Sequence, residues 1–311
     1  MGTPARQNRA AALLSVASNA LLTLVKLAVG LVSGSVAVLS EAANSAGDLI
    51  ASAIAFAGVR AAARPADDDH PYGHEKTENL AAAIEGALVL AAGAAVAVEA
   101  VRRLVTGAPA IAHLDLAVAV MAASAIVNLV VSARLRRTAR RTGSPAIEGD
   151  AAHLASDVWT SGGTAAGLGL VAVTGWTPLD SLVALAVAGY VIAVGSRLAW
   201  RAAQVLLDSS LPREELEVID DVLAGFSRAE AISFHALRGR RAGAKRHVDL
   251  HMVVPPETTV REGHAMSGRV KAAVRQALPG SEVLIHLEDH PPRRRPLDGR
   301  GRGAAATLAG R

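Results

Sequence analysis

The sequence predicts an α-helical membrane protein with six transmembrane helices and a C-terminal cytoplasmic α+β domain. Hydrophobic residues make up 51% of the 311 residues, although only 3% are aromatic. Ala, Val, Leu and Gly dominate the chain up to about residue 207, and the remainder is mixed and charged. This contrast predicts a transmembrane domain at 1–207, an α+β domain at 208–290 and a disordered, arginine-rich tail at 291–311.

Six apolar stretches are long enough to cross a bilayer, which takes about 20 helical residues. They are 10–32, 36–62, 79–104, 113–135, 148–173 and 179–203. Basic residues gather on one side of this arrangement, at Arg6, Arg9, Arg60, Arg64, Lys76, Arg134, Arg136, Arg137, Arg140, Arg141, Arg197 and Arg201. The loops of the other side have only Arg102 and Arg103 nearby. The positive-inside rule therefore predicts a multi-pass protein of the cell (inner) membrane with both termini in the cytoplasm.

The composition narrows the possible partners. The chain has no cysteine, which excludes disulfides and thiolate metal sites. The net charge is +4 and the pI is about 9.9, but much of the positive excess lies in short loops and in the tail. We therefore expect the lipid bilayer as a partner and no nucleic acid. No cleavable signal peptide is expected, because the first apolar stretch is long enough to span.

Ionisable residues within spanning helices are costly and usually functional. Asn44 and Asp48 lie four apart in the second stretch, and His153 and Asp157 lie four apart in the fifth. Residues at this spacing share a helix face, so two such helices facing each other would converge four ligands on a divalent cation. The alternative is that these side chains form hydrogen bonds between helices. Structural or access roles are expected for Glu41, Glu85, Glu99 and Asp180.

The soluble segment shows both helical and strand periodicities. REELEVIDDVLAGF predicts an amphipathic helix over 213–226, and TVREGHAMSGRVKAAVRQAL predicts another over 259–278. AISFHALRGRRAG and KRHVDLHMVV predict two strands joined by a turn at Ala242–Gly243, and SEVLIHLED predicts a third strand. The order αββαβ is typical of a small α+β domain.

Four motifs resemble the cation diffusion facilitator (CDF) family. They are SEAANSAGD in the second stretch, ADDDHPYGHEKTEN in the following loop, GDAAHLASDVWTS in the fifth stretch and LLD at the end of the sixth. The resemblance covers about 10–290. It implies a homodimeric transporter, not an enzyme, that moves a divalent transition metal out of the cytoplasm in exchange for protons. It also implies that the cytoplasmic domain has a metallochaperone-like, ferredoxin-like fold.

The resemblance also implies roles for individual residues. The transport site would use Asn44, Asp48, His153 and Asp157, and a loop site would use Asp67, His70 and His74. A cytoplasmic site would use His235, His251, His264, His286 and Glu288, and an interdomain charge pair would join Lys76 and Asp208. The alternatives are a solvated turn in the loop, structural histidines in the domain, and two independent surface charges.

Ligand chemistry restricts the metal. The imidazole of His153 favours zinc, iron, cobalt or nickel over manganese, whereas Asn44 is a neutral, weaker ligand where zinc-transporting members of the family often have Asp or His. Zn²⁺ is the expected ion, and Fe²⁺, Co²⁺, Ni²⁺, Mn²⁺ or Cd²⁺ are the alternatives. Protons compete with the metal for these ligands. A protein of another class, a membrane metal sensor or scaffold that moves no ions, is also open. A metal-dependent hydrolase is disfavoured, because the sequence has no HExxH and no nucleophile motif.

Overall fold

The computed structural model of the protein describes residues 3–33, 36–106, 114–176 and 178–290. The chain forms two compact units. One consists of Met1–Leu211 together with Arg240–Arg246, and the other consists of Pro212–Gly239 and His247–Arg311. The tail predicted at 291–311 lies outside the described residues.

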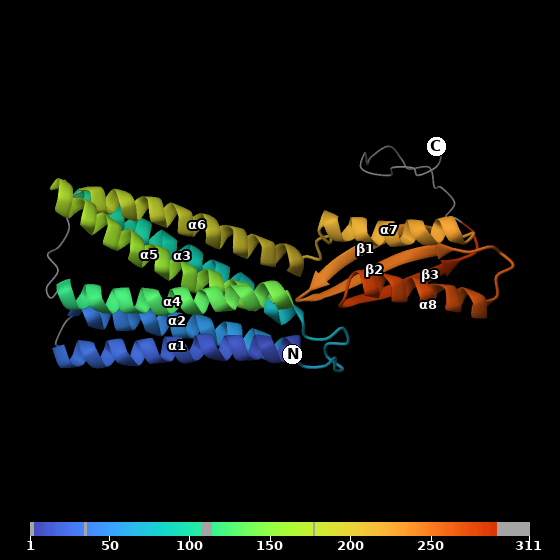
Figure 1. The fold of residues 1–311 in the computed structure, drawn as a ribbon, viewed down its shortest axis with the longest axis horizontal. Coiled ribbons are helices and arrows are strands. Elements are labelled where there is room, and N and C mark those ends of the chain that lie inside the picture. The colour runs from blue at the N-terminus through green and yellow to red at the C-terminus, as the bar shows by residue number, and fades with distance from the viewer. Residues whose placement is uncertain (1–2, 34–35, 107–113, 177, 291–311) are drawn as a thin grey trace. The chain divides into compact units, whose positions relative to one another are not determined.

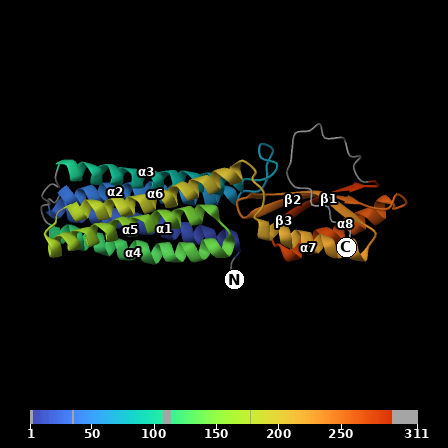
Figure 2. The ribbon, with the colours of Figure 1, turned by 90° about the horizontal axis from the view of Figure 1, so that it is seen from above.

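The described part of the first unit contains six long helices: α1 (Pro4–Ser33), α2 (Val36–Ala62), α3 (Lys76–Thr106), α4 (Leu114–Thr142), α5 (Pro145–Thr174) and α6 (Pro178–Leu206). They run alongside one another in both views of the ribbon (Figures 1 and 2). Their order and ranges match the six predicted stretches.

Apolar stretches and charged stretches alternate along these helices. Within the described residues, four stretches are long and apolar enough to cross a membrane: Pro4–Val32, Ser45–Ala62, Lys76–Thr106 and Ser181–Leu206. Helices α4 and α5 are of similar length but are charged along part of it. The end of α4 carries a run of arginines, and the first half of α5 carries GDAAHLASD.

Helices α3 and α6 approach closely because glycines remove side chains from their contact. A Cβ added at Gly195 of α6 would lie 2.7 Å from the backbone N of Leu90 and 3.0 Å from the carbonyl O of Gly86. A Cβ added at Gly86 would lie 2.5 Å from the backbone N of Ala199. Small residues let helix backbones approach in membranes, where close packing replaces the hydrophobic effect as the source of association. The α3–α6 contact therefore depends on these two glycines.

We expect Gly195→Ala to destabilise the helical unit by about 1–3 kcal/mol, because the added methyl group meets backbone atoms that cannot rotate away. Thermal unfolding in detergent micelles measures this as a lower midpoint. Gly189→Ala in the same helix is the control, since a Cβ at Gly189 has nothing within 4 Å and alanine favours the helix. Equal midpoints for the two variants would contradict the close contact.

Residues 213–288 form two helices and a three-stranded sheet, in the predicted αββαβ order. The elements are α7 (Arg213–Ala229), β1 (Ser233–Ala242), β2 (Lys245–Val253), α8 (Val260–Ala277) and β3 (Ser281–Glu288), and the sheet order is β1-β2-β3. The hairpin turn is one residue later than predicted, at 243–244. Gly243 has a φ of +57°, a left-handed conformation that glycine adopts without a steric cost.

Period-two alternation gives the sheet two different faces. On β2, Val248, Leu250 and Met252 are buried and belong to the core. The helices add Ile219 and Leu223 from α7 and Val270 and Val274 from α8. The intervening residues of β2 include His251 and are less buried, because successive side chains of a strand point to opposite faces. The sheet thus separates an apolar core from a face that carries histidines.

Candidate metal sites

Three ionisable side chains converge inside the helical unit. Asp48 comes from α2, and His153 and Asp157 come from consecutive turns of α5. Each offers a ligand atom within 4.8 Å of the others, and His153 Nε2 lies 3.4 Å from Asp48 Oδ1. Ligands bound to a tetrahedral zinc ion are about 3.4 Å apart, given bonds of about 2.0–2.2 Å. The side chain of His153 is 8% exposed and that of Asp48 is 23% exposed. The cluster is therefore enclosed, and its two carboxylates can offset the charge of a dication.

Asn44 is the fourth residue predicted for this site, and its side chain lies outside the described residues. Its position in α2 is one turn before the aspartate ligand. On α5, hydroxyl groups support both ligand-bearing turns. Ser156 donates to the carbonyl O of His153 at 2.7 Å, and Thr160 donates to that of Asp157 at 3.1 Å. Each of these ligands is therefore tied to the residue three positions further along the helix.

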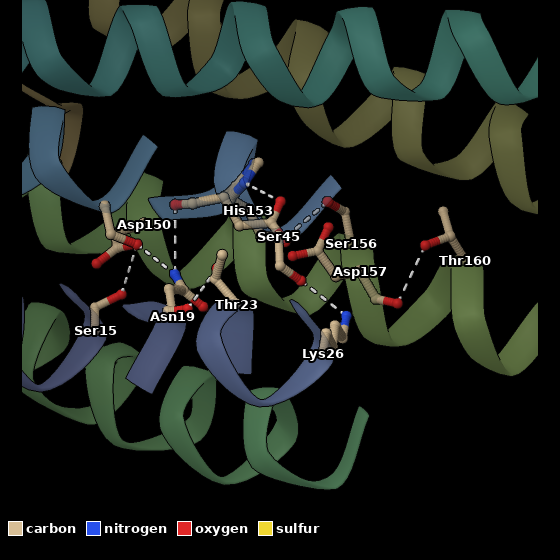
Figure 3. A network of polar contacts seen from close by, with 12 residues as sticks. Ser15, Asn19, Thr23, Lys26, Ser45, Asp150, His153, Ser156, Asp157 and Thr160 are labelled. Carbon is tan, nitrogen blue, oxygen red and sulfur yellow. Dashed lines mark hydrogen bonds and ion pairs between the residues drawn. The ribbon is translucent and has the colours of Figure 1, made fainter. Parts of the chain in front are cut away.

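A buried polar network joins α1, α2 and α5 beside these ligands (Figure 3). Ser15 and Ser52 donate to Asp150 Oδ1 at 3.0 and 3.3 Å. Asn19 Nδ2 donates to Ser52 Oγ at 2.6 Å. All four side chains are at most 2% exposed. Asp150 lies one turn before the histidine ligand, and Ser52 lies one turn after the aspartate ligand of α2. Hydrogen bonds at this level hold α2 and α5 in register and so fix the spacing of the ligands.

The sequence pattern alone did not reveal this network. A partial signal was present, because Ser15 and Asn19 are four apart in α1 and Asp150 lies on the ligand face of α5. The partners on the other helices follow only from the fold. A second unpredicted contact joins α1 to α2, where Lys26 Nζ donates to Ser45 Oγ at 2.8 Å and Lys26 is 5% exposed. A buried cation thus lies on α1 near the transport ligands (Figure 3).

The loop between α2 and α3 holds a second cluster, formed by Asp67, His70 and His74. The carboxylate of Asp67 lies 3.4 Å from His70 Nδ1 and 3.3 Å from His74 Nε2. The hydrogen bond from the backbone N–H of His70 to Asp67 Oδ1 holds the pKa of Asp67 below its ordinary value. Asp67 is therefore ionised at neutral pH. The predicted loop residues lie together in the arrangement that a shared cation requires.

Asp208 follows the end of α6 and pairs with two cations. Asp208 Oδ1 lies 2.7 Å from Lys76 Nζ and 2.9 Å from Arg240 Nη1. The backbone of Asp208 is left-handed, with a φ of +57°. The N–H of Ser209 donates to the carbonyl O of Gln204, which is the six-to-one bond of a Schellman ending. The way in which α6 ends therefore orients the carboxylate toward Lys76. Lys76 and Asp208 were predicted to form a pair between two domains. The pair is present, but both residues belong to the first unit, as does Arg240, which was not predicted.

The hydrogen bond from Lys76, followed by that from Arg240, lowers the pKa of Asp208. A carboxylate whose pKa is lower in the folded chain stabilises the fold at neutral pH. This contribution is lost as the pH falls through the pKa of the folded state. Because Asp208 and Lys76 are 47% and 36% exposed, the contribution is small, and the pair is better regarded as a positional contact.

The turn between β1 and β2 belongs to the first unit. The backbone N–H of Gly243 donates to Asn79 Oδ1 at 2.7 Å in a buried position, and Lys245 pairs with Glu75. A Cβ added at Gly243 would lie 2.7 Å from the carbonyl O of Glu75. The beginning of α3 therefore holds this turn by a buried hydrogen bond, an ion pair and a close backbone approach.

A third cluster lies on the sheet, where β1, β2 and β3 supply His235, His251 and Glu288. Glu288 Oε2 lies 2.8 Å from His235 Nε2, and Glu288 Oε1 lies 2.8 Å from His251 Nδ1. Desolvation works to raise the pKa of Glu288, but the hydrogen bonds from the two imidazoles outweigh it and the pKa lies below its ordinary value. An ionised carboxylate between two imidazoles is a donor set that suits zinc.

The other predicted histidines lie outside this group. His286 borders it, because its ring centroid lies 4.9 Å from that of His251 and its Nε2 lies 3.9 Å from Glu288 Oε1. His264 is exposed on α8 and is not among the described residues that reach ligand distance of one another. Of the four histidines predicted for the cytoplasmic site, the structure therefore brings two together with the carboxylate.

Long apolar helices around an enclosed cluster of metal-binding side chains define a membrane protein that handles cations. Residues 12–207 match the family described as "Cation efflux transmembrane domain", and residues 211–290 match "Cation efflux protein, cytoplasmic domain". The chain belongs to the cation efflux family, the cation diffusion facilitators, whose members are metal transporters.

Similar proteins cover most of the chain. An uncharacterized transporter of Synechocystis sp. is 35% identical over 91% of this chain and 91% of its own length. The cation-efflux pump FieF of Escherichia coli O127:H6 is 31% identical over 89% of this chain and 91% of its own length. A structure of the proposed zinc transporter CzrB in its zinc form is 38% identical over 28% of this chain and 99% of that chain, with a TM-score of 0.27.

We expect Glu288→Gln to weaken zinc binding at the sheet cluster at least 10- to 100-fold. Loss of a group that only supports a ligand already weakens metal binding by this factor. The amide removes the charge that the two imidazoles share. Calorimetric titration of the full chain in detergent with Zn²⁺ measures the loss as one weakened class of sites. Glu282→Gln, at a 58% exposed position of the same strand, is the control and should titrate like the unmodified chain. An unchanged titration of Glu288→Gln would exclude this cluster as a zinc site.

Proposed function

We propose that this cation efflux protein exports zinc from the cytoplasm in exchange for protons. The observation that supports the proposal is the enclosed cluster of Asp48, His153 and Asp157, contributed by two helices of the transmembrane unit. A site that only anchors helices needs hydrogen-bond partners, whereas this cluster presents one nitrogen and two carboxylate donors to a common point. Iron, cobalt, nickel, manganese or cadmium would be alternative cargo.

The donor set supports zinc over the harder cations. Imidazole is a preferred ligand of zinc, iron, cobalt and nickel, whereas magnesium, calcium and manganese favour sites made of oxygen alone. The distance of 3.4 Å between His153 Nε2 and Asp48 Oδ1 suits tetrahedral coordination. Asn44 would complete the site from one turn earlier in α2. Its amide oxygen binds more weakly than a carboxylate, which favours release of the cargo over tight storage.

Exchange for protons follows from the same ligands. Imidazole and carboxylate groups bind a metal in their deprotonated forms, so metal and protons compete for them. Imidazole changes its protonation state within the physiological pH range. Protonation on the outer side would expel the cargo, and arrival of cargo from the cytoplasm would displace the protons. The helices would alternate between the two openings around a site within the membrane, as transporters do.

The protein would act as a homodimer in the cell (inner) membrane and would catalyse no chemical reaction. The four stretches of high hydropathy support the membrane location, and the basic side of the predicted topology supports cytoplasmic termini. The loop cluster at Asp67, His70 and His74 would bind the same metal near the cytoplasmic end of the helices and deliver it. The sheet cluster would bind metal as a regulatory signal. Both roles are consistent with donors that reach ligand distance.

A membrane sensor or scaffold is the rival function. Such a protein would bind metal without moving it, and exposed clusters such as those of the loop and the sheet would suffice. It would have no use for a site enclosed between helices, where burying Asp48 and Asp157 is costly. The enclosed cluster therefore favours transport.

We expect zinc to accumulate in proteoliposomes that contain the protein, driven by a pH gradient, and Asp157→Asn to abolish this uptake. The variant loses one of the two charges that offset the dication. Asp221→Asn, the same change at an exposed position of α7, should transport at the rate of the unmodified chain. Zinc binding without uptake by the unmodified chain would refute export and favour the sensor.

We expect Asn44→Asp to change the ion preference, because it replaces a neutral, weaker ligand of the transport site with a third carboxylate. Competitive uptake of zinc, cobalt, nickel, iron, manganese and cadmium measures the preference. The same uptake by Asn79→Asp, a substitution in α3 where the amide contacts the β1–β2 turn, gives the effect of an added charge elsewhere. An ion preference identical to that of the unmodified chain would show that Asn44 does not set selectivity.

A further inference from the structure

Glu85 is a buried carboxyl group that the transport ligands do not use. It lies in α3 and is fully buried, at 0% exposed. Neither of its oxygens has a hydrogen-bond partner among the described residues. Its Cβ and Cγ would lie 3.0 and 3.2 Å from a Cβ at Gly149 of α5, so the side chain lies directly against the helix that carries two of the ligands. An ionised carboxylate in such a place is strongly disfavoured unless a cation is near.

The charged groups that act on Glu85 all come from α5. They are His153, Asp150 and Asp157, which include two of the proposed metal ligands. Helix α6, which also packs against α3, carries Arg197 and Arg201, and both are exposed. Helix α2 also packs against α3, and its described part carries the ligand Asp48, which is partly buried, and Arg60, which is exposed. Glu85 thus packs against α5 one turn before His153, and the arginines in the described parts of α2 and α6 are exposed.

Asp150 is buried to the same extent but has a different role. Its Oδ1 accepts hydrogen bonds from two serine hydroxyls at 3.0 and 3.3 Å. This oxygen is therefore part of the network that holds α1, α2 and α5 together (Figure 3). Neither oxygen of Glu85 takes part in such a hydrogen bond among the described residues. Asp150 Oδ2 also has no hydrogen-bond partner among the described residues, but of these two carboxyl groups Glu85 is the one with neither oxygen engaged in a contact between helices.

We propose that Glu85 carries one of the exchanged protons and releases it when a dication binds to Asp48, His153 and Asp157. The inference rests on the proposed transport function and extends it to a residue that is not a ligand. Without a cation at the site, the carboxyl group keeps its proton. The positive charge of bound metal favours the carboxylate across a medium of low dielectric constant. The O–H bond then breaks, the proton passes to water on the side to which the site is open, and the carboxylate stays buried against α5.

This coupling is reciprocal. If bound metal weakens the hold of Glu85 on its proton, protonation of Glu85 weakens metal binding by the same factor. A proton arriving from the outer side would therefore help to expel the cargo even though it never touches the metal. The ligands remain available for the next ion. The proton on Glu85 does not have to leave before the metal is fully coordinated.

The test counts protons released per chain when the full chain is saturated with Zn²⁺ in detergent, with a pH-indicator dye. We expect Glu85→Gln to release about one proton fewer per chain than the unmodified protein. The slope of log Kd against pH should also fall by about one. The loop and sheet clusters release the same protons in both proteins and cancel in the difference. Glu78→Gln is the matched control, because Glu78 is a buried carboxyl group of the same helix, at 7% exposed, and the charged group acting on it is Glu75.

Glu85→Met is the second variant, because it removes the carboxyl group while keeping a side chain of similar size that suits an apolar site. Loss of about one proton per zinc-saturated chain in both variants, with Glu78→Gln unchanged, would support the proposal. A proton count equal to that of the unmodified chain in either variant that binds zinc would overturn it. Failure of the unmodified chain to bind zinc at the membrane site would instead refute the proposed function, so the two failures are distinguishable.

Discussion

The cost of holding ionisable side chains away from water governs the helical unit. Buried charge is tolerated in a membrane only where partners or a bound ion compensate it. Asp48, His153 and Asp157 meet this condition as a group, since each offers a ligand atom within 4.8 Å of the others. Asp150 meets it through two hydroxyl donors. The positions of α1, α2 and α5 meet this requirement, because they bring the ligands together and give Asp150 its serine donors.

Helix packing outside the site follows a different rule. Between α3 and α6, backbones approach until a methyl group at Gly86 or Gly195 would lie within 3 Å of backbone atoms. Such contacts depend on shape and have no preferred polar partner. The hydrogen-bonded network beside the ligands depends on direction and has a single good register. The glycine contact therefore fixes how closely α3 and α6 lie. The hydrogen-bonded network fixes the direction in which the ligands point.

The sequence predicted the number and order of helices and strands, because apolar length and period-two alternation are local properties. It also predicted pairs such as Lys76 with Asp208, which lie at fixed positions in recognisable motifs. It did not predict Arg240 as a second partner of Asp208, since that contact joins residues 32 apart in the chain. His264 was assigned to the sheet cluster by resemblance, but it is exposed on α8. Contacts between residues of different elements depend on how the elements pack, and local sequence patterns do not predict that packing.

The three clusters differ in how their carboxylates become available to metal. Asp67 and Glu288 lie outside the membrane, and hydrogen bonds from His70 in the loop and from His235 and His251 in the sheet keep their pKa values low. Their carboxylates are ionised at neutral pH, so binding there needs no proton release from the carboxyl group. Helices enclose the third cluster, and burial opposes free charge. In the enclosed site a cation and the protons of the ligands replace each other between helices, which is the condition that turns binding into exchange.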